Sequence, residues 1–317
     1  MSNKLTAVTM ACALACWGCS DSSDTPLQPA LLTQYTLGSD DSVPEGVAFD
    51  PEQRNFYATS LQGASITRVA ADGSESLFRQ PDDRAEILGA QVDAQSRRLW
   101  VCARAVDGID NQVWMYDLNS GELQETFTLG ALATNGSCND LDLDTTGLAY
   151  VTDSGNPTVY RLDPTTGKGE VFAASPLLAD ITGFGLGQNG IAVSPDGTAL
   201  IVAIFTPPAL VRVSLPEGEA VTSIALTGDT LPSPDGIVFV DGDLYTVANA
   251  SVSRVRLNGD FTAGTVVTVA QRSGLSTAAN AEDQLYVIKS EVTNFVLGEP
   301  LDLPFEIFRV DTGEFDQ

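Results

Sequence analysis

A pattern of short strands recurs six times along the chain, and it restricts the possible folds more than any other feature. Each copy has a turn-like pair, a short apolar strand that ends near an acidic turn, and a second strand rich in aromatic or β-branched residues. The copies start 41 to 51 residues apart, at Glu45, Leu88, Asn139, Asn189, Asp235 and Ser276. A period of about 40 to 50 residues with four short strands per copy is typical of a β-propeller.

The ends of the repeat array predict how the ring closes. The last copy has no fourth strand after residues 306–310, and residues 31–37, ahead of the first copy, have the character of that missing strand. We therefore predict an all-β fold, a six-bladed β-propeller over residues 31–317 that is closed by an N-terminal strand. Closure leaves few free strand edges, whereas an open solenoid needs no such strand. In the fourth copy, residues 221–226 are expected to form the single fourth strand.

Residues 1–19 have the composition of a signal peptide. Lys4 is followed by an uncharged apolar run that ends at Cys19 and is too short to span a bilayer comfortably. Gly18 and Cys19, followed by serines and aspartates, resemble the end of a bacterial lipoprotein signal, with residues 20–30 as a polar tether. We expect a lipid on Cys19 and a location in the bacterial cell envelope, facing the periplasm or the exterior. Ordinary secretion and lipidation of Cys16 are the alternatives.

Two of the five cysteines, Cys102 and Cys138, lie outside this leader. An exported protein can hold a disulfide, and both residues fall near the same rim of neighbouring copies. We expect them to be bonded to each other. The alternative is two separate buried thiols.

Charge and histidine content exclude several functions. The chain has 16 Lys and Arg against 42 Asp and Glu, a formal net charge of −26, which repels nucleic-acid phosphates and anionic lipid headgroups. It has no histidine, so Ser-His-Asp and Cys-His catalysis and the usual zinc, copper and iron sites are ruled out. The chemistry must rest on carboxylates, amides and hydroxyls, which suit calcium or magnesium.

The first residues of the six copies share one phase of the repeat. The first strand of each propeller blade lines the central channel, so these side chains would form a circle around one axis. Taken singly, Glu45, Asn139, Asn189 and Asp235 are ordinary turn residues, but together they would bring two carboxylates and two amides to one point. Uncompensated carboxylates repel each other, which predicts a bound cation. Calcium is favoured over magnesium because it accepts six to eight mixed oxygen ligands.

These residues also carry a family resemblance. The motifs Pro44-Glu45-Gly46, Cys138-Asn139-Asp140, Asn189-Gly190 and Pro234-Asp235-Gly236 resemble those of the regucalcin, gluconolactonase and diisopropyl fluorophosphatase superfamily, over residues 31 to 313. The resemblance implies a catalytic calcium held by Glu45, Asn139, Asn189 and Asp235. It also implies that Asp235 is the nucleophile or general base, with Asp140 close by.

Two departures from the family pattern bear on the substrate. Ser137 stands where sugar-lactonase members typically carry an arginine, and Ser276 and Thr277 stand where some members carry a histidine. A plainer lactone or ester is therefore as well supported as a sugar-acid lactone. Four side chains are candidates for the walls of the pocket, namely Arg104, Phe184, Phe205 and Phe295.

Three functional hypotheses follow. The first is an exported, calcium-dependent hydrolase of lactones, esters or phosphoesters, with a small-molecule substrate. The second is a non-catalytic envelope propeller whose calcium is structural and whose rim binds a protein or glycan. The third is a synthase-like propeller without metal, which the complete set of four ligands disfavours.

Overall fold

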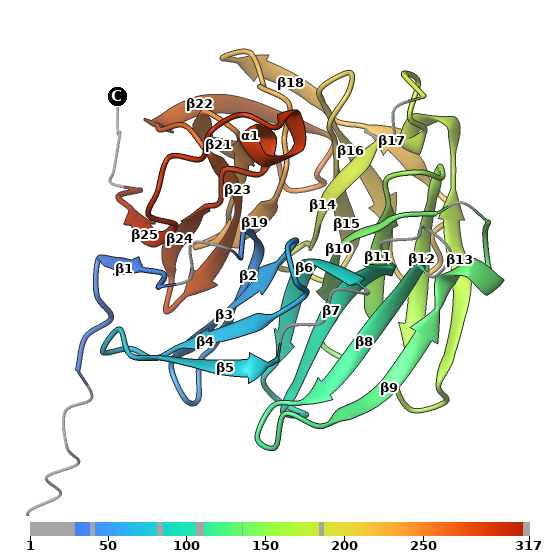
Figure 1. Ribbon diagram of the computed structural model, residues 1–317. Helices are drawn as coiled ribbons and strands as arrows, with labels where there is room; N and C mark the ends of the chain where they lie inside the picture. The colour runs from blue at the N-terminus through green and yellow to red at the C-terminus, as the bar shows by residue number, and fades with distance from the viewer. Residues whose placement is uncertain are drawn as a thin grey trace, which may run out of the picture. The chain divides into compact units, whose positions relative to one another are not determined.

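Six sheets follow one another along the chain and form the blades of a six-bladed β-propeller (Figure 1). The computed structural model describes residues 29–38, 42–80, 85–105, 111–134, 136–183 and 187–312. The chain divides into Met1–Ala30 and Leu31–Gln317, and the blades belong to the second unit. The predicted signal peptide and Cys19 lie outside the described residues.

The first three blades are antiparallel sheets of four consecutive strands. Blade 1 has β2 (Pro44–Asp50), β3 (Asn55–Ser60), β4 (Ile66–Val69) and β5 (Glu75–Arg79). Blade 2 has β6 (Ala85–Asp93), β7 (Arg98–Ala105), β8 (Asn111–Asp117) and β9 (Leu123–Thr128). Blade 3 has β10 (Cys138–Leu143), β11 (Ala149–Asp153), β12 (Thr158–Asp163) and β13 (Lys168–Ala174).

The last three blades are built less uniformly. Blade 4 has β14 (Gln188–Val193), β15 (Ala199–Ile204), β16 (Ala209–Ser214) and β17 (Val221–Ser223). Blade 5 has β19 (Ile237–Val240), β20 (Asp243–Ala248), β21 (Ser251–Leu257), β22 (Ala263–Gln271) and an added strand β18 (Ala225–Gly228). Blade 6 has β23 (Leu275–Ala281), β24 (Gln284–Lys289), β25 (Glu306–Val310) and β1 (Gln34–Thr36).

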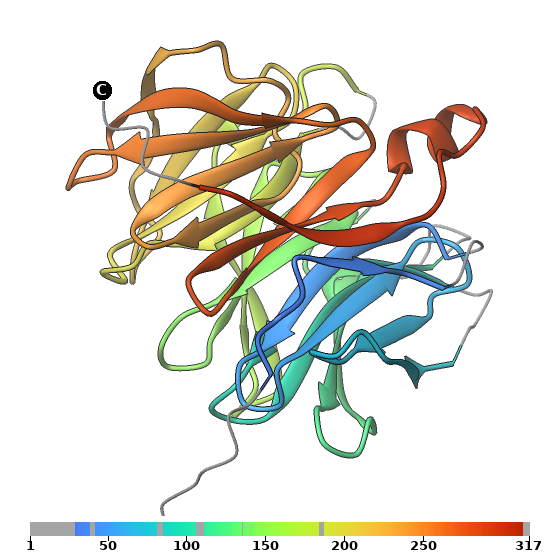
Figure 2. The ribbon, with the colours of Figure 1, turned by 90° about the vertical axis from the view of Figure 1, so that its left-hand side faces the viewer.

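The helical segments are short. They are η1 (Leu129–Ala131), η2 (Pro176–Leu178) and α1 (Val292–Leu297). The helix α1 stands off the strands of blade 6, in the connection between β24 and β25 (Figure 2). In the part of the chain that the structure describes, no helix has both the length and the apolar character needed to cross a bilayer.

The predicted N-terminal strand closes the ring. β1 pairs antiparallel with β25, with Gln34 opposite Phe308, and so supplies the outer strand of blade 6. Tyr35 of β1 is buried against Phe56 of blade 1 and Tyr286 of blade 6, with ring centroids 5.3 and 6.3 Å away. Because aromatic burial is a large apolar contribution, this cluster ties the first blade to the last.

Blade 4 differs from the prediction for residues 221–226. That run is not one strand, because the chain leaves blade 4 after Ser223 and resumes as β18, which pairs in parallel with β22 of blade 5. Ile224, between the two strands, is buried and marks the crossing. The passage covers the outer edge of blade 5, which would otherwise present unpaired backbone groups.

A β-bulge near the start of the innermost strand recurs around the ring. In blade 1, Pro44 pairs with Ser60 but Val47 pairs with Ala58, so one extra residue is inserted at Glu45-Gly46. The register shifts at the corresponding place in blades 2, 3, 4 and 6. Bulges bend a strand and change the direction of its side chains. The repeated bulge therefore sets the orientation of the first residue in these five copies.

In blade 1, the residue after Glu45 must be small, because blade 2 lies against it. A Cβ atom on Gly46 would lie 2.4 Å from the carbonyl oxygen of Leu88 in blade 2. We expect Gly46→Ala to lower the free energy of unfolding by about 2 kcal/mol or more, because the backbones would have to separate. Gly259→Ala is the control, since no atom lies within 4 Å of its Cβ position. Urea unfolding measures both variants, and equal stabilities would contradict the close contact.

Candidate functional site

The first residues of the six copies occupy equivalent places at the junctions between blades. Five of their backbone carbonyl groups accept a hydrogen bond from the preceding blade. The bonds run from Ser276 Oγ to Glu45 O (2.8 Å), Thr59 Oγ1 to Leu88 O (2.6 Å), Thr152 Oγ1 to Asn189 O (2.6 Å), Gly190 N to Asp235 O (2.8 Å) and Gly236 N to Ser276 O (2.9 Å). The sixth carbonyl, that of Asn139, lies against Gly89 of blade 2. The six residues share one phase of the ring, as the repeat register predicts.

Carboxyl groups from three blades interact at this end of the channel. Burial raises the pKa of Glu45 well above its usual value, and the charges of Asp235 and Asp140 raise it further. Burial also raises the pKa of Asp235 to about 7, opposed by a hydrogen bond from the side chain of Asn189. Without a cation, burial and mutual repulsion both disfavour the charged forms of these groups.

Asp140 belongs to the same group of acids. Burial raises the pKa of Asp140 to about 7, and the charges of Asp142 and Asp235 act in the same direction. Its Oδ1 accepts the backbone N–H of Leu141 at 2.9 Å. In blades 1, 2, 4 and 5 the same position is a glycine, and a Cβ on Gly89 would lie 2.2 Å from Asp140 Oδ1. The carboxyl group of Asp140 thus fills space that the neighbouring glycine leaves.

Two buried oxygen atoms of the predicted ligands lack a partner. Glu45 Oε2 and Asn139 Oδ1 have no hydrogen bond in the structure, although Glu45 is only 7% exposed. A buried acceptor without a donor costs about 1 to 3 kcal/mol, so a cation in contact with both oxygens would remove a cost. Among the described residues, no three His, Cys, Asp or Glu side chains form a metal site by themselves. The predicted set has two carboxylates, and its remaining ligands are amides.

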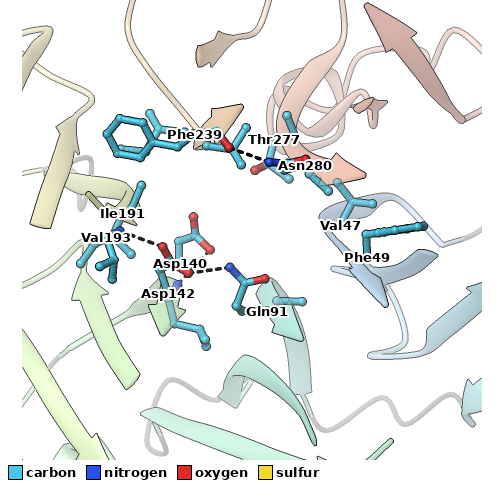
Figure 3. A pocket seen from close by; sticks show the side chains of 17 residues that line it. Val47, Phe49, Gln91, Asp140, Asp142, Ile191, Val193, Phe239, Thr277 and Asn280 are labelled. Atoms are coloured by element: carbon cyan, nitrogen blue, oxygen red, sulfur yellow. Dashed lines mark hydrogen bonds between the residues drawn. The ribbon is translucent and has the colours of Figure 1, made fainter. Parts of the chain in front are cut away.

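A cavity of about 260 Å³ lies further along the channel. Its walls are residues of the innermost strands, including Val47, Phe49, Phe239 and Asn280, and Asp140 reaches it (Figure 3). None of the four predicted ligands lines this cavity. Asp140 is therefore the link between the ligand positions at the start of the strands and the space inside the channel.

Asp142 is not among the site residues predicted from the sequence, but it also lines the cavity. Its Oδ1 accepts Gln91 Nε2 at 2.6 Å, and its Oδ2 accepts the backbone N–H of Val193 at 2.7 Å (Figure 3). Burial raises its pKa. The alternation Asp140-Leu141-Asp142 could have predicted that Asp142 faces the channel, because residues two apart in an innermost strand face the same side. Asp142 joins blade 3 to blades 2 and 4.

The predicted wall residues are placed differently from one another. Arg104 is paired with Glu86, with 2.5 Å between Arg104 Nη2 and Glu86 Oε2, and its Nη1 donates to Ser137 Oγ at 3.0 Å. Its charge also lowers the pKa of Glu45, which opposes the effect of burial. Phe295 lies on α1 and is 36% exposed. Phe205 is half-buried after β15, and Phe184 lies outside the described residues.

A disulfide joins blades 2 and 3 beside the site. Cys102 of β7 and Cys138 of β10 are bonded, with Cα atoms 5.3 Å apart. Cys138 directly precedes Asn139, so the bond restrains the backbone that carries one of the predicted ligands. Both cysteines are fully buried.

Comparison with known proteins identifies the family. The sequence profile described as "SMP-30/Gluconolactonase/LRE-like region" matches residues 43–290. The chain belongs to the SMP-30/gluconolactonase/LRE-like family. Its matched region runs from before Glu45 to after β24, so it contains all six first residues and Asp140. Among curated proteins, none matches the chain.

Solved structures share the fold of this SMP-30/gluconolactonase/LRE-like protein at low sequence identity. The allergen Mala s 1 of Malassezia sympodialis is 16% identical, with a TM-score of 0.72, over 90% of this chain and 97% of the allergen. A gluconolactonase of Xanthomonas campestris is 18% identical, with a TM-score of 0.61, over 90% and 99%. A calcium-binding regucalcin of Agrobacterium tumefaciens is 17% identical, with a TM-score of 0.59, over 86% and 92%.

Proposed function

We propose that the protein is a calcium-dependent hydrolase of a lactone, ester or phosphoester. Family membership supports a lactonase-type hydrolase, and similar folds include a gluconolactonase and a calcium-binding regucalcin. The observation that carries the proposal is the pair of unpartnered oxygens, Glu45 Oε2 and Asn139 Oδ1, in a ring that also holds Asp235. Such oxygens are the donors that calcium prefers.

Glu45, Asn139, Asn189 and Asp235 would hold the ion. When bound, a calcium ion can polarise a carbonyl or phosphoryl oxygen and orient a water molecule. The backbone at Asp235 is fixed on both sides, because its N–H donates to Val247 O at 2.7 Å and its carbonyl accepts Gly190 N at 2.8 Å. The amide of Asn189 hydrogen-bonds its carboxyl group.

The surroundings of Asp235 and Asp140 support the roles that we propose for them. A positioned carboxyl group with a pKa near neutral can take a proton from an attacking group and return it to a leaving group. Asp235 is assigned this role, as base or as nucleophile. Asp140 interacts electrostatically with both Asp235 and Glu45, and we propose that it holds a proton between the ligands and the cavity.

The experiment is a hydrolysis assay on the fragment that lacks the leader, with a panel of lactones, phenyl acetate and a phosphotriester. We expect turnover with calcium and none with a chelator. The substrates that react would define the class of bond. Absence of turnover, together with a calcium-dependent rise in melting temperature, would favour a propeller with structural calcium that binds a protein or glycan.

We also propose that the protein is exported and anchored in the bacterial cell envelope through a lipid on Cys19. The leader sequence supports this, and the disulfide between Cys102 and Cys138 fits an oxidising compartment. Mass spectrometry of the mature protein is expected to find a lipid-modified Cys19 at its N-terminus. A mature chain that begins elsewhere without lipid would support ordinary secretion.

A further inference from the structure

Arginine side chains join neighbouring blades at the other end of the innermost strands. Arg97, in the first hairpin of blade 2, binds both oxygens of Asp50 in blade 1, through Nη1 to Oδ1 at 2.6 Å and Nη2 to Oδ2 at 2.8 Å. Arg54, at the same hairpin position in blade 1, binds Glu282 of blade 6, with Nη2 2.9 Å from Oε2. Both arginines have left-handed backbone conformations, with φ of 55° at Arg97 and 56° at Arg54. An arginine–carboxylate ion pair therefore bridges both the junction of blades 1 and 2 and the junction of blades 6 and 1.

The junction between blades 2 and 3 has the carboxylate but not the arginine. Asp93 is the equivalent of Asp50, since it also ends the innermost strand of its blade. Its Oδ1 accepts the backbone N–H of Ser96 at 2.9 Å, but its Oδ2 is buried and has no partner. The hairpin position that holds Arg97 in blade 2 holds Gly147 in blade 3, with φ of 85°. A Cβ atom on Gly147 would lie 3.9 Å from Asp93 Oδ2.

Space for a ligand lies at this junction. A groove of about 760 Å³ is bounded by residues 92–96 of blade 2 and 143–147 of blade 3. Asp144, on its far side, already uses both oxygens, because Oδ1 accepts Leu148 N at 3.1 Å and Oδ2 accepts the Tyr150 hydroxyl at 3.1 Å. Of the two aspartates at this groove, Asp93 is thus the one with an oxygen that lacks a hydrogen-bond partner.

We propose that this groove binds a guanidinium group from another molecule, in the place that Arg97 occupies one blade earlier. The planar guanidinium matches both oxygens of a carboxylate, whereas a lysine ammonium is a point charge. A buried carboxylate oxygen without a partner, on a residue that is only 8% exposed, favours such a partner. The net charge of −26 attracts cationic ligands at long range. The ligand is either an arginine side chain of a peptide or protein, or a small guanidinium compound.

Titration calorimetry with two probes tests the proposal and separates the sources. The probes are methylguanidinium and the tripeptide acetyl-Ala-Arg-Ala-amide, and the matching lysine tripeptide is the reference. We expect the arginine tripeptide to bind at least about tenfold more tightly than the lysine one. Equal affinity per guanidinium for the two probes would indicate a small ligand. Stronger binding of the tripeptide would indicate a protein partner.

Two variants locate the site. Asp93→Asn should weaken binding at least about tenfold, because it removes the charge without changing the shape. Gly147→Arg should abolish binding, since the new side chain would occupy the groove from within. Gly197→Arg is the control, because Gly197 is also a hairpin glycine with positive φ, in blade 4, and no atom lies within 4 Å of its Cβ position. It should leave binding unchanged.

The outcomes that overturn the proposal are distinct. Equal binding of the arginine and lysine tripeptides would show that the acidic surface attracts any cation. Binding that is insensitive to Asp93→Asn would place the site elsewhere. Calcium binding that depends on Asp93, with no binding of either guanidinium probe, would make the groove a metal site instead.

Discussion

The variant Asp235→Asn is expected to lose calcium-dependent hydrolysis by at least about a thousandfold while the ring stays folded. The substitution removes a negative ligand and the group assigned to accept a proton. It leaves the shape of the side chain and both backbone hydrogen bonds of residue 235 in place. Initial rates at saturating calcium measure the effect, and melting temperature shows that the propeller remains folded.

Asp241→Asn is the matched control. Asp241 lies in the same blade and is exposed, so Asp241→Asn makes the same chemical change away from the channel. It should keep full activity. To separate ion binding from proton transfer, calcium affinity is measured for Asp235→Asn and for Glu45→Gln. An Asp235→Asn protein that turned over substrate at the normal rate would remove Asp235 from the chemistry.

In the presence of a chelator, the melting temperature is expected to fall by roughly 5 °C or more between pH 5 and pH 8. Asp140 and Asp235 have folded-state pKa values raised to about 7, against an ordinary value of 3.8. Below about pH 4 both states hold these protons. As the pH rises towards 7, the unfolded chain releases them while the folded chain retains them, so stability is lost up to about pH 7 and then levels off. Bound calcium should remove most of this slope, because it stabilises the ionised carboxylates.

Two variants test whether these acids cause the slope. Asp140→Asn should reduce the pH dependence of the chelated protein, because the neutral amide has no proton to lose and only the contribution of Asp235 remains. Asp241→Asn should leave it unchanged. A chelated protein that is equally stable at pH 5 and pH 8 would mean that Asp140 and Asp235 ionise normally in the folded state.

The sequence predicted the ring and its register because both follow from repetition. Six copies at nearly constant spacing fix the number of blades, and phase separates Asp235 from the locally similar Asp196, which lies in the hairpin after β14. The closing strand was also predictable, because the last copy lacks a fourth strand and the segment before the first copy can provide it. Its observed pairing with β25 confirms that interpretation.

Other features depend on contacts that repetition does not encode. Residues 221–226 form one apolar-polar run in sequence, and only packing of Ile224 shows that the chain changes blades there. Asp142 binds residues about 50 positions away on both sides. The unpaired oxygen of Asp93 points to a missing partner only when Asp93 and Gly147 are compared in space with the paired residues Asp50 and Arg97.

The pairing of β1 with β25 has a consequence for the order of assembly. Gln34 Nε2 donates to Glu306 Oε1 across 272 positions of sequence, so the last blade is complete only when two distant segments meet. The inner blades are made of consecutive strands and can form locally, whereas this step needs a long-range encounter, which is intrinsically slow. Until it occurs, blades 1 and 6 lack their shared aromatic cluster around Tyr35, and the ring remains open. We therefore expect the channel to be completed late in folding, when β1 meets β25.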